Sequence, residues 1–113
     1  MDWVKTINRA IEYMEDHLTE DIALKDIAGS IHLSAFHFQR AFSLLTGMSP
    51  AEYLRKRRLS EAGAVLADGR VKVIDAALKY GYDTPESFAK AFTRHHGVTP
   101  TQVKNGSSIR FMN

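Results

Sequence analysis

The sequence of 113 residues contains no cysteine, and no apolar run in it approaches the length of a membrane span. Without thiols the chain forms neither a disulfide framework nor a thiolate metal site. A bilayer span needs about 20 consecutive apolar residues, and the first residues lack the charged-then-apolar pattern of a signal peptide. We therefore expect a soluble protein of the cytoplasm that has no membrane partner.

The short motifs of catalysis and metal binding are also missing. The sequence has no HExxH pair, no nucleophile elbow and no phosphate-binding glycine loop. Five histidines are present, but the adjacent His95 and His96 are expected to diverge from each other on a helix. We therefore expect no catalytic residue, no metal site and no cofactor, and we expect that the protein is not an enzyme.

Charge is unevenly distributed along the chain, although the overall net charge is only +2. Residues 1–33 carry three basic and seven acidic side chains, whereas residues 34–113 carry twelve basic and six acidic ones. A basic remainder behind an acidic front end favours one surface that faces phosphates and another that faces elsewhere. We expect the following acids to lie away from any nucleic acid: Asp2, Glu12, Glu15, Asp16, Glu20 and Asp21.

Helical periodicity accounts for the first half of the sequence. A stripe at three- and four-residue spacing predicts a first helix with Val4, Ile7, Ile11, Met14 and Leu18 on its buried face. A short helix is expected from Leu24 to Ala28, ended by Gly29. Ser34 is the expected N-cap of the next helix, which ends at Gly47 and whose inner face is Phe38, Ala41, Phe42 and Leu45.

Proline and glycine positions predict the helices of the second half. Ser49-Pro50 begins a long helix to about Asp68, stopped by Gly69, because proline at the first helical position loses no hydrogen bond. A short helix marked by Val73, Ile74 and Ala77 is expected to end near Gly81. Thr84-Pro85 then begins a helix that ends at Gly97, and Thr99-Pro100 begins the last one. The predicted inner face of the helix between Thr84 and Gly97 is Phe88, Ala91, Phe92 and His95.

The sequence repeats itself at an offset of 50 residues without a gap. Aromatic, glycine and capping positions agree between the copies, as in the pairs Phe38 and Phe88, Phe42 and Phe92, Gly47 and Gly97, Ser34 and Thr84, and Leu24 and Ile74. Each copy contains a short helix, a tight turn and a second capped helix, which is the outline of a helix-turn-helix. A helical bundle produced by duplication explains the repeat equally well.

The length of the helix between the two copies favours the first alternative. From Pro50 to about Ala67 it is expected to be ~27 Å long at 1.5 Å per residue, and successive major-groove faces on one side of B-DNA lie ~34 Å apart. A rod of this length lets one chain present two recognition helices to adjacent grooves. We therefore expect a monomer on an asymmetric site.

Two stretches of the sequence resemble the AraC/XylS family of bacterial regulators. One runs from Ser34 to Phe42 (SAFHFQRAF) and continues with Thr46-Gly47 and Ser49-Pro50. The other begins at Ile74-Asp75-Ala76-Ala77 and continues with Gly81-Tyr82, Ser87-Phe88, Phe92, Gly97 and Thr99-Pro100. The resemblance covers roughly residues 4–104. It implies an all-α fold of about seven helices, with two helix-turn-helix units joined by a long linker helix.

The resemblance also implies function. Its members bind double-stranded DNA at bacterial promoters, and they activate transcription more often than they repress it, through contact with RNA polymerase. By position, the base-contacting residues of the first recognition helix are Phe36, Gln39 and Arg40. Arg40 can make a bidentate contact to guanine, Gln39 can pair with adenine, and Phe36 can touch a thymine methyl group.

The second recognition helix departs from the pattern of the family. Its outward positions are Pro85, Glu86, Ala89 and Lys90, of which Glu86 and Lys90 are the candidate base contacts. Ala89 offers only a methyl group, and Glu86 repels phosphate unless it accepts from a cytosine amino group. We therefore expect the second unit to dock on DNA more than it contacts base edges.

Basic residues crowd the start of the linker helix. Four consecutive positions cannot all face one side of a helix, so we expect one or two of them to contact phosphate and Arg58 to pair internally with an acid such as Asp75. The full set of candidate phosphate contacts is Arg55, Lys56, Arg57, Lys90 and Arg94. A fully solvated run is the alternative.

The expected organisation is a single domain over residues 1–113. Its first helix-turn-helix unit is expected at 1–48, the linker helix at 50–68 and the second unit at 70–104. Residues 105–113 are expected to be a tail, or a linker to a missing effector domain that would follow Asn113.

Two alternatives to a regulator that acts alone remain open. One is a DNA-binding fragment of a longer ligand-responsive regulator, and the other is a helical interaction module that does not bind DNA.

Overall fold

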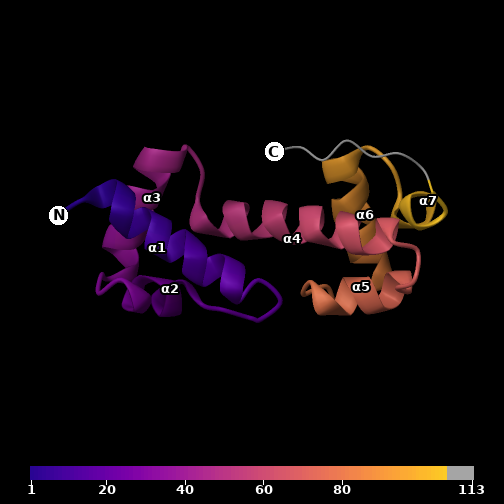
Figure 1. Cartoon of the computed structure of the whole chain (residues 1–113), viewed down its shortest axis with the longest axis horizontal. Helices are drawn as coiled ribbons and strands as arrows, with labels where there is room; N and C mark the ends of the chain where they lie inside the picture. The colour runs from indigo at the N-terminus through magenta and orange to yellow at the C-terminus, as the bar shows by residue number, and fades with distance from the viewer. Residues whose placement is uncertain (107–113) are drawn as a thin grey trace. The chain divides into compact units, whose positions relative to one another are not determined.

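The computed structural model describes residues 1–106, and this part of the chain contains seven α-helices and no strand (Figure 1). The predicted all-α fold with about seven helices is therefore confirmed. The helices are α1 Trp3–Asp16, α2 Leu24–Ser30, α3 Ala35–Thr46, α4 Pro50–Ala67, α5 Val73–Lys79, α6 Pro85–His96 and α7 Pro100–Lys104.

The chain divides into two compact units, and the division falls within α4, between Arg55 and Lys56. Figure 1 shows α4 as one unbroken helix. Its residue Leu54 belongs to the core of the first unit, whereas Leu59, Ala62 and Leu66 belong to the core of the second. The linker helix is thus an integral part of both units. The boundaries expected for the helix-turn-helix units themselves stay a prediction.

The core of the first unit forms where α1 packs on α2 and α3. Asp2 begins α1 by accepting a hydrogen bond from the amide of Lys5 at 3.1 Å, and Ile7 and Met14 of the predicted stripe are buried. The two ends of that stripe differ from the prediction. Val4 is 62% exposed because it lies on the first turn, beyond the edge of the core, and Leu18 is buried although α1 has already ended at Asp16.

The core of the second unit forms between the last part of α4 and helices α5, α6 and α7. Phe88 and Phe92 of α6 are completely buried, together with Leu66 of α4. Ile74, one of the three residues that marked this helix in the sequence, is 48% exposed, and α5 buries Ala76 and Ala77.

The two units repeat the same local structure, which confirms the internal repeat. The short helices α2 and α5 have 7 residues each, and the longer helices α3 and α6 have 12 residues each. Both longer helices end on a left-handed glycine, Gly47 with φ 77° and Gly97 with φ 78°. Glycine adopts this backbone conformation without a Cβ clash.

The repeat is not free of gaps, however, and this corrects the predicted alignment. The structure equates Leu24 with Val73, since these residues begin α2 and α5, so the short helices match at an offset of 49 while the long helices match at 50. One extra residue therefore lies in the second turn. The shift explains why Ile74, which the ungapped alignment paired with Leu24, is exposed.

The turns of the two units also differ in the residue that adopts positive φ. Gly29 was expected to end α2, but it lies inside the helix, and His32 takes the left-handed conformation at φ 60°. The matching position in the second unit is Gly81, at φ 90°. In both turns the next residue donates its amide to an alanine of the short helix, Leu33 to the Ala28 carbonyl at 3.0 Å and Tyr82 to the Ala77 carbonyl at 2.9 Å.

Candidate nucleic-acid interface

Helix α3 is held by one face, which leaves the opposite face available for contact. Ser34 caps it by accepting from the His37 amide at 3.1 Å, as predicted. Phe38 and Phe42 are completely buried, with ring centroids 5.6 Å apart. On the other side Phe36 is 68% exposed, and Gln39 and Arg40 are also exposed.

The three predicted base-contacting residues of α3 lie around one shallow depression of about 320 Å³, together with Ser43. Their spacing of three and four residues explains this, since such residues follow one another along a single face of a helix. All three are therefore exposed on one face of α3, and their contact with bases stays a prediction. Ser43 was missed, although it continues the same row seven residues after Phe36.

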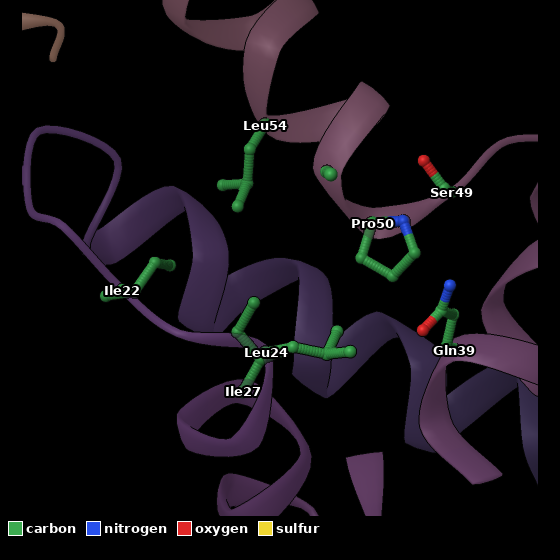
Figure 2. A pocket seen from close by; sticks show the side chains of 8 residues that line it. Ile22, Leu24, Ile27, Gln39, Ser49, Pro50 and Leu54 are labelled. Carbon is green, nitrogen blue, oxygen red and sulfur yellow. The ribbon is translucent and has the colours of Figure 1, made fainter. Parts of the chain in front are cut away.

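Gln39 also lines a second cavity of about 320 Å³, whose other lining residues differ from those of the first (Figure 2). Figure 2 shows Gln39 and Ser49 together at one end of this cavity, with the apolar side chains of Ile22, Leu24, Ile27 and Leu54 toward the other. The Ser49 hydroxyl accepts from the Glu52 amide at 3.1 Å and so caps α4. The side-chain amide of Gln39 makes no hydrogen bond within residues 1–106. Its N–H donors and its carbonyl oxygen are therefore available to a ligand.

Arg40, like Gln39, lines two hollows of the surface. It also borders an apolar groove of about 340 Å³, lined further by Trp3, His37, Ala41, Leu44 and Leu45. Leu45 was predicted on the inner face of α3 but is 49% exposed, because Phe42 and the helix end at Gly47 already close the core there. Arg40 makes no ion pair within the described residues, and its guanidinium therefore keeps all its donors for an outside partner.

Helix α6 repeats the arrangement of α3 with different outward chemistry. Thr84 caps it through the Ser87 amide at 3.1 Å, with Pro85 at the first position. The exposed positions carry Glu86, Lys90 and Arg94, whereas Ala89 is half-buried. Neither Lys90 nor Arg94 forms an ion pair within residues 1–106. This face of α6 offers one acid and two cations, and it has no long uncharged donor that corresponds to Gln39 of α3.

The basic run of α4 separates into side chains with different surroundings. Arg55 and Lys56 are exposed, and Arg57 and Arg58 are half-buried. Arg57 Nη2 donates to Glu61 Oε1 at 3.0 Å, an ion pair at the i,i+4 spacing. The predicted partner of Arg58, Asp75, is exposed and forms no ion pair in the described part of the chain. Arg57 of this run is therefore paired, and the expected Arg58–Asp75 pair is not formed.

His95 and His96 do not diverge as the sequence suggested, and the buried one is His96. Their rings meet edge to face with centroids 4.6 Å apart. His96 continues the four-residue row of Phe88 and Phe92 and is 8% exposed, whereas His95 is half-buried. Burial lowers the pKa of both imidazoles below the ordinary value of 6.5, so both are neutral at pH 7.

Within residues 1–106 no group of three or more histidine, aspartate or glutamate side chains could hold a metal ion. None of the helices in this part of the chain is long and apolar enough to cross a membrane.

Comparison with known proteins identifies the family. Residues 27–106 match the family of helix-turn-helix domains. The HTH-type transcriptional activator AarP of Providencia stuartii is 39% identical over 95 residues, which cover 84% of this chain and 70% of AarP. Two other curated regulators are much longer, and the chain spans 34% of one and 37% of the other.

Solved structures agree on the fold. An AraC-type transcriptional regulator from Chromobacterium violaceum superposes with a TM-score of 0.84 at 22% identity, over 90% of this chain and 91% of that one. The DNA-binding domain of AdpA, solved in complex with a target DNA, gives a TM-score of 0.79 at 24% identity over 88% and 90% of the two chains. With the matched helix-turn-helix region and the close relative AarP, these findings show that the chain belongs to the AraC/XylS family of DNA-binding transcription regulators.

Proposed function

We propose that the chain binds one asymmetric duplex site as a monomer, that it activates transcription from that site, and that it has no enzymatic activity. The observation that carries this proposal is the row of Phe36, Gln39 and Arg40 on one exposed face of the capped helix α3. Arginine and glutamine make bidentate contacts to guanine and adenine in the major groove, and an apolar ring contacts the thymine methyl group.

The two units have unequal roles in this proposal. The first supplies most of the sequence preference through α3, because it has two side chains capable of bidentate base contacts. The second supplies affinity through Lys90 and Arg94 of α6, with Glu86 as its one candidate for accepting from a cytosine amino group. Arg55 and Lys56 add phosphate contacts. Arg57 remains in the set, although its guanidinium already pairs with Glu61.

A monomer is proposed because α4 connects the units through 18 helical residues without a break. Such a helix is ~27 Å long, and adjacent major-groove faces are ~34 Å apart. One chain then supplies both recognition helices, which in other regulators come from the two subunits of a dimer. The DNA site therefore needs no two-fold symmetry.

Activation and contact with RNA polymerase are proposed from two observations. The relative AarP is described as a transcriptional activator. The first helix also carries exposed acids, Glu12 and Asp16 among them, that phosphate would repel and that are therefore available to a protein partner. Such a partner, like the promoter itself, belongs to the bacterial cytoplasm.

A longer ligand-responsive regulator is the second candidate. The chain spans about a third of some curated relatives, so an effector domain outside these residues is compatible with every contact proposed above. In that case DNA binding stays with this chain, and the response to a ligand belongs to the other domain.

Selection of bound sequences from a random duplex library tests the proposal. We expect one enriched, asymmetric motif of about 20 base pairs, with its most constrained positions at one end. A palindromic motif contradicts the monomer. No enrichment at all, from protein whose helices are intact, supports the helical interaction module that does not bind DNA.

A further inference from the structure

The second unit holds its recognition helix on the linker helix by two histidine hydrogen bonds. His96, the last residue of α6, donates from Nε2 to the carbonyl oxygen of Leu59 in α4 at 2.7 Å. Next to it, His95 Nε2 lies 3.2 Å from the hydroxyl of Ser60. Two adjacent side chains of α6 thus bond two adjacent residues of α4.

The chemistry of the His96 bond fixes its tautomer. A carbonyl oxygen only accepts, so the proton must lie on Nε2, and Nδ1 of the neutral ring has none. The ring packs on Phe92 with centroids 4.3 Å apart and on His95 at 4.6 Å. A second proton would therefore place a full positive charge among buried aromatic rings, which is costly.

The first unit has no such arrangement at the equivalent position. Thr46 occupies the place of His96, and its hydroxyl lies 2.7 Å from the carbonyl oxygen of Phe42 and 3.1 Å from that of Met48. These partners belong to α3 itself and to the turn that follows it. A threonine hydroxyl does not titrate, so proton-dependent positioning can arise in the second unit and not at this site of the first.

We infer that His95 and His96 are positioning residues that fix the end of α6 on α4, and that their protonation weakens the DNA contact of the second unit. The inference rests on the proposed function, in which Lys90 and Arg94 of the same helix contact phosphates. Lys90 and Arg94 lie six and two residues before His96 on the same helix, so a shift of the helix end moves their charged groups relative to the DNA backbone.

The surroundings of the pair disfavour the protonated form of both imidazoles. Burial is the largest cause that lowers the pKa of His95, followed by the charges of His96 and of Lys56 on α4. Burial also lowers the pKa of His96, against the opposing effect of its bond to Leu59. Two tyrosines, Tyr80 and Tyr82, also pack in this core. Burial raises the pKa of Tyr80, and so does the charge of Glu61 on α4. Tyr80 is thus uncharged where the histidines titrate.

The experiment measures affinity for the selected duplex by fluorescence anisotropy, from about pH 8 to about pH 5.5, across the ordinary histidine range. For the unchanged protein we expect affinity to fall several-fold as pH falls below about 6.5. The sign is diagnostic, because protonation of an imidazole that itself faced the DNA would attract phosphate and act the other way. Circular dichroism at each pH shows whether the helices persist.

Two variants separate positioning from simple stability. His96→Gln keeps an N–H donor for the Leu59 carbonyl but does not titrate, and His95→Gln does the same toward Ser60. Each is expected to bind as the unchanged protein does at pH 8 and to lose part of the fall at low pH. His17→Gln is the matched control: this histidine lies beside Glu20 in the first unit, and its replacement should leave the profile unchanged. Should His96→Gln fail to fold, His95→Gln alone carries the test.

Several outcomes overturn the inference. A flat profile for a protein that binds DNA rejects it while the proposed function survives, and so does a profile that both variants leave unchanged. A fall in affinity that coincides with a loss of helix content indicates global unfolding and also rejects it. Failure of the unchanged protein to bind at any pH rejects the proposed function itself.

Discussion

The hydroxyl of Tyr53 in α4 donates a hydrogen bond to the carboxylate of Glu15 in α1, with 3.0 Å between the two oxygens. The bond joins residues 38 positions apart and gives a half-buried acid of the front end a structural role. Glu15 therefore differs from its acidic neighbours, which the sequence could not separate from it.

Tyr53→Phe tests that role. A hydrogen bond to a charged group contributes about 1.5–3 kcal/mol, and partial exposure places this one at the lower end of that range, so we expect the free energy of unfolding to fall by about 1.5 kcal/mol in urea titrations. Tyr13→Phe is the matched control, since Tyr13 lies on the same core and stacks on His17. Equal losses in both variants would show that the Tyr53 hydroxyl has no special role.

Charge reversal on the exposed side of α1 tests where the acidic face lies. Glu12→Lys and Asp16→Lys change exposed residues and avoid Glu15. Because we expect this face to lie away from phosphate, affinity for the selected duplex should stay nearly unchanged at low and moderate salt. A large gain in affinity would instead place α1 beside the DNA backbone.

The salt dependence of binding tests the phosphate contacts. Log affinity should fall linearly with log salt concentration, by about 0.9 for each phosphate contact. Arg55→Ala should reduce this slope by about one contact. Arg57→Ala should reduce it less, because the Arg57 guanidinium already pairs with Glu61. A larger effect from Arg57 than from Arg55 would show that DNA displaces Glu61.

Arg40→Ala and Lys90→Ala compare the two recognition helices. Arg40→Ala should cost about 1–3 kcal/mol on the selected duplex and relax the preference at one or two base pairs. Lys90→Ala should weaken the selected and a scrambled duplex by similar factors and reduce the salt slope by about one. Both variants need titration against both duplexes at two salt concentrations. If Lys90→Ala removes the sequence preference and Arg40→Ala acts uniformly, the roles of the two helices are reversed.

Local rules predicted the helix boundaries well because the signals are themselves local. Ser34 and Thr84 cap the helices that their position suggested, and Gly47 and Gly97 end them. The buried aromatic rows, such as Phe38 with Phe42, also followed from spacing alone. The exposed positions of Phe36, Gln39 and Arg40 were then fixed by the same periodicity.

Details that depend on tertiary contact were not predictable in this way. His96 follows Phe88 and Phe92 at four-residue spacing, but His95 follows Ala91 at the same spacing, and Ala91 also packs on the core. Only the packing of His96 against Leu59 makes it the buried one. Similarly, the exposure of Leu45 depends on what the core leaves uncovered. By contrast, the i,i+4 spacing of Arg57 and Glu61 was a usable signal, and Ser43 could have been found as the next residue in the row of Arg40.

The central claim is that one chain binds one asymmetric site with both units. Sedimentation analysis of the complex with the selected duplex, at protein concentrations above and below the duplex concentration, tests it directly. We predict a single complex of one chain per duplex, which persists when protein is in excess and is lost when either half of the site is scrambled. Two chains on one duplex, or full affinity for either half of the site alone, would contradict the account.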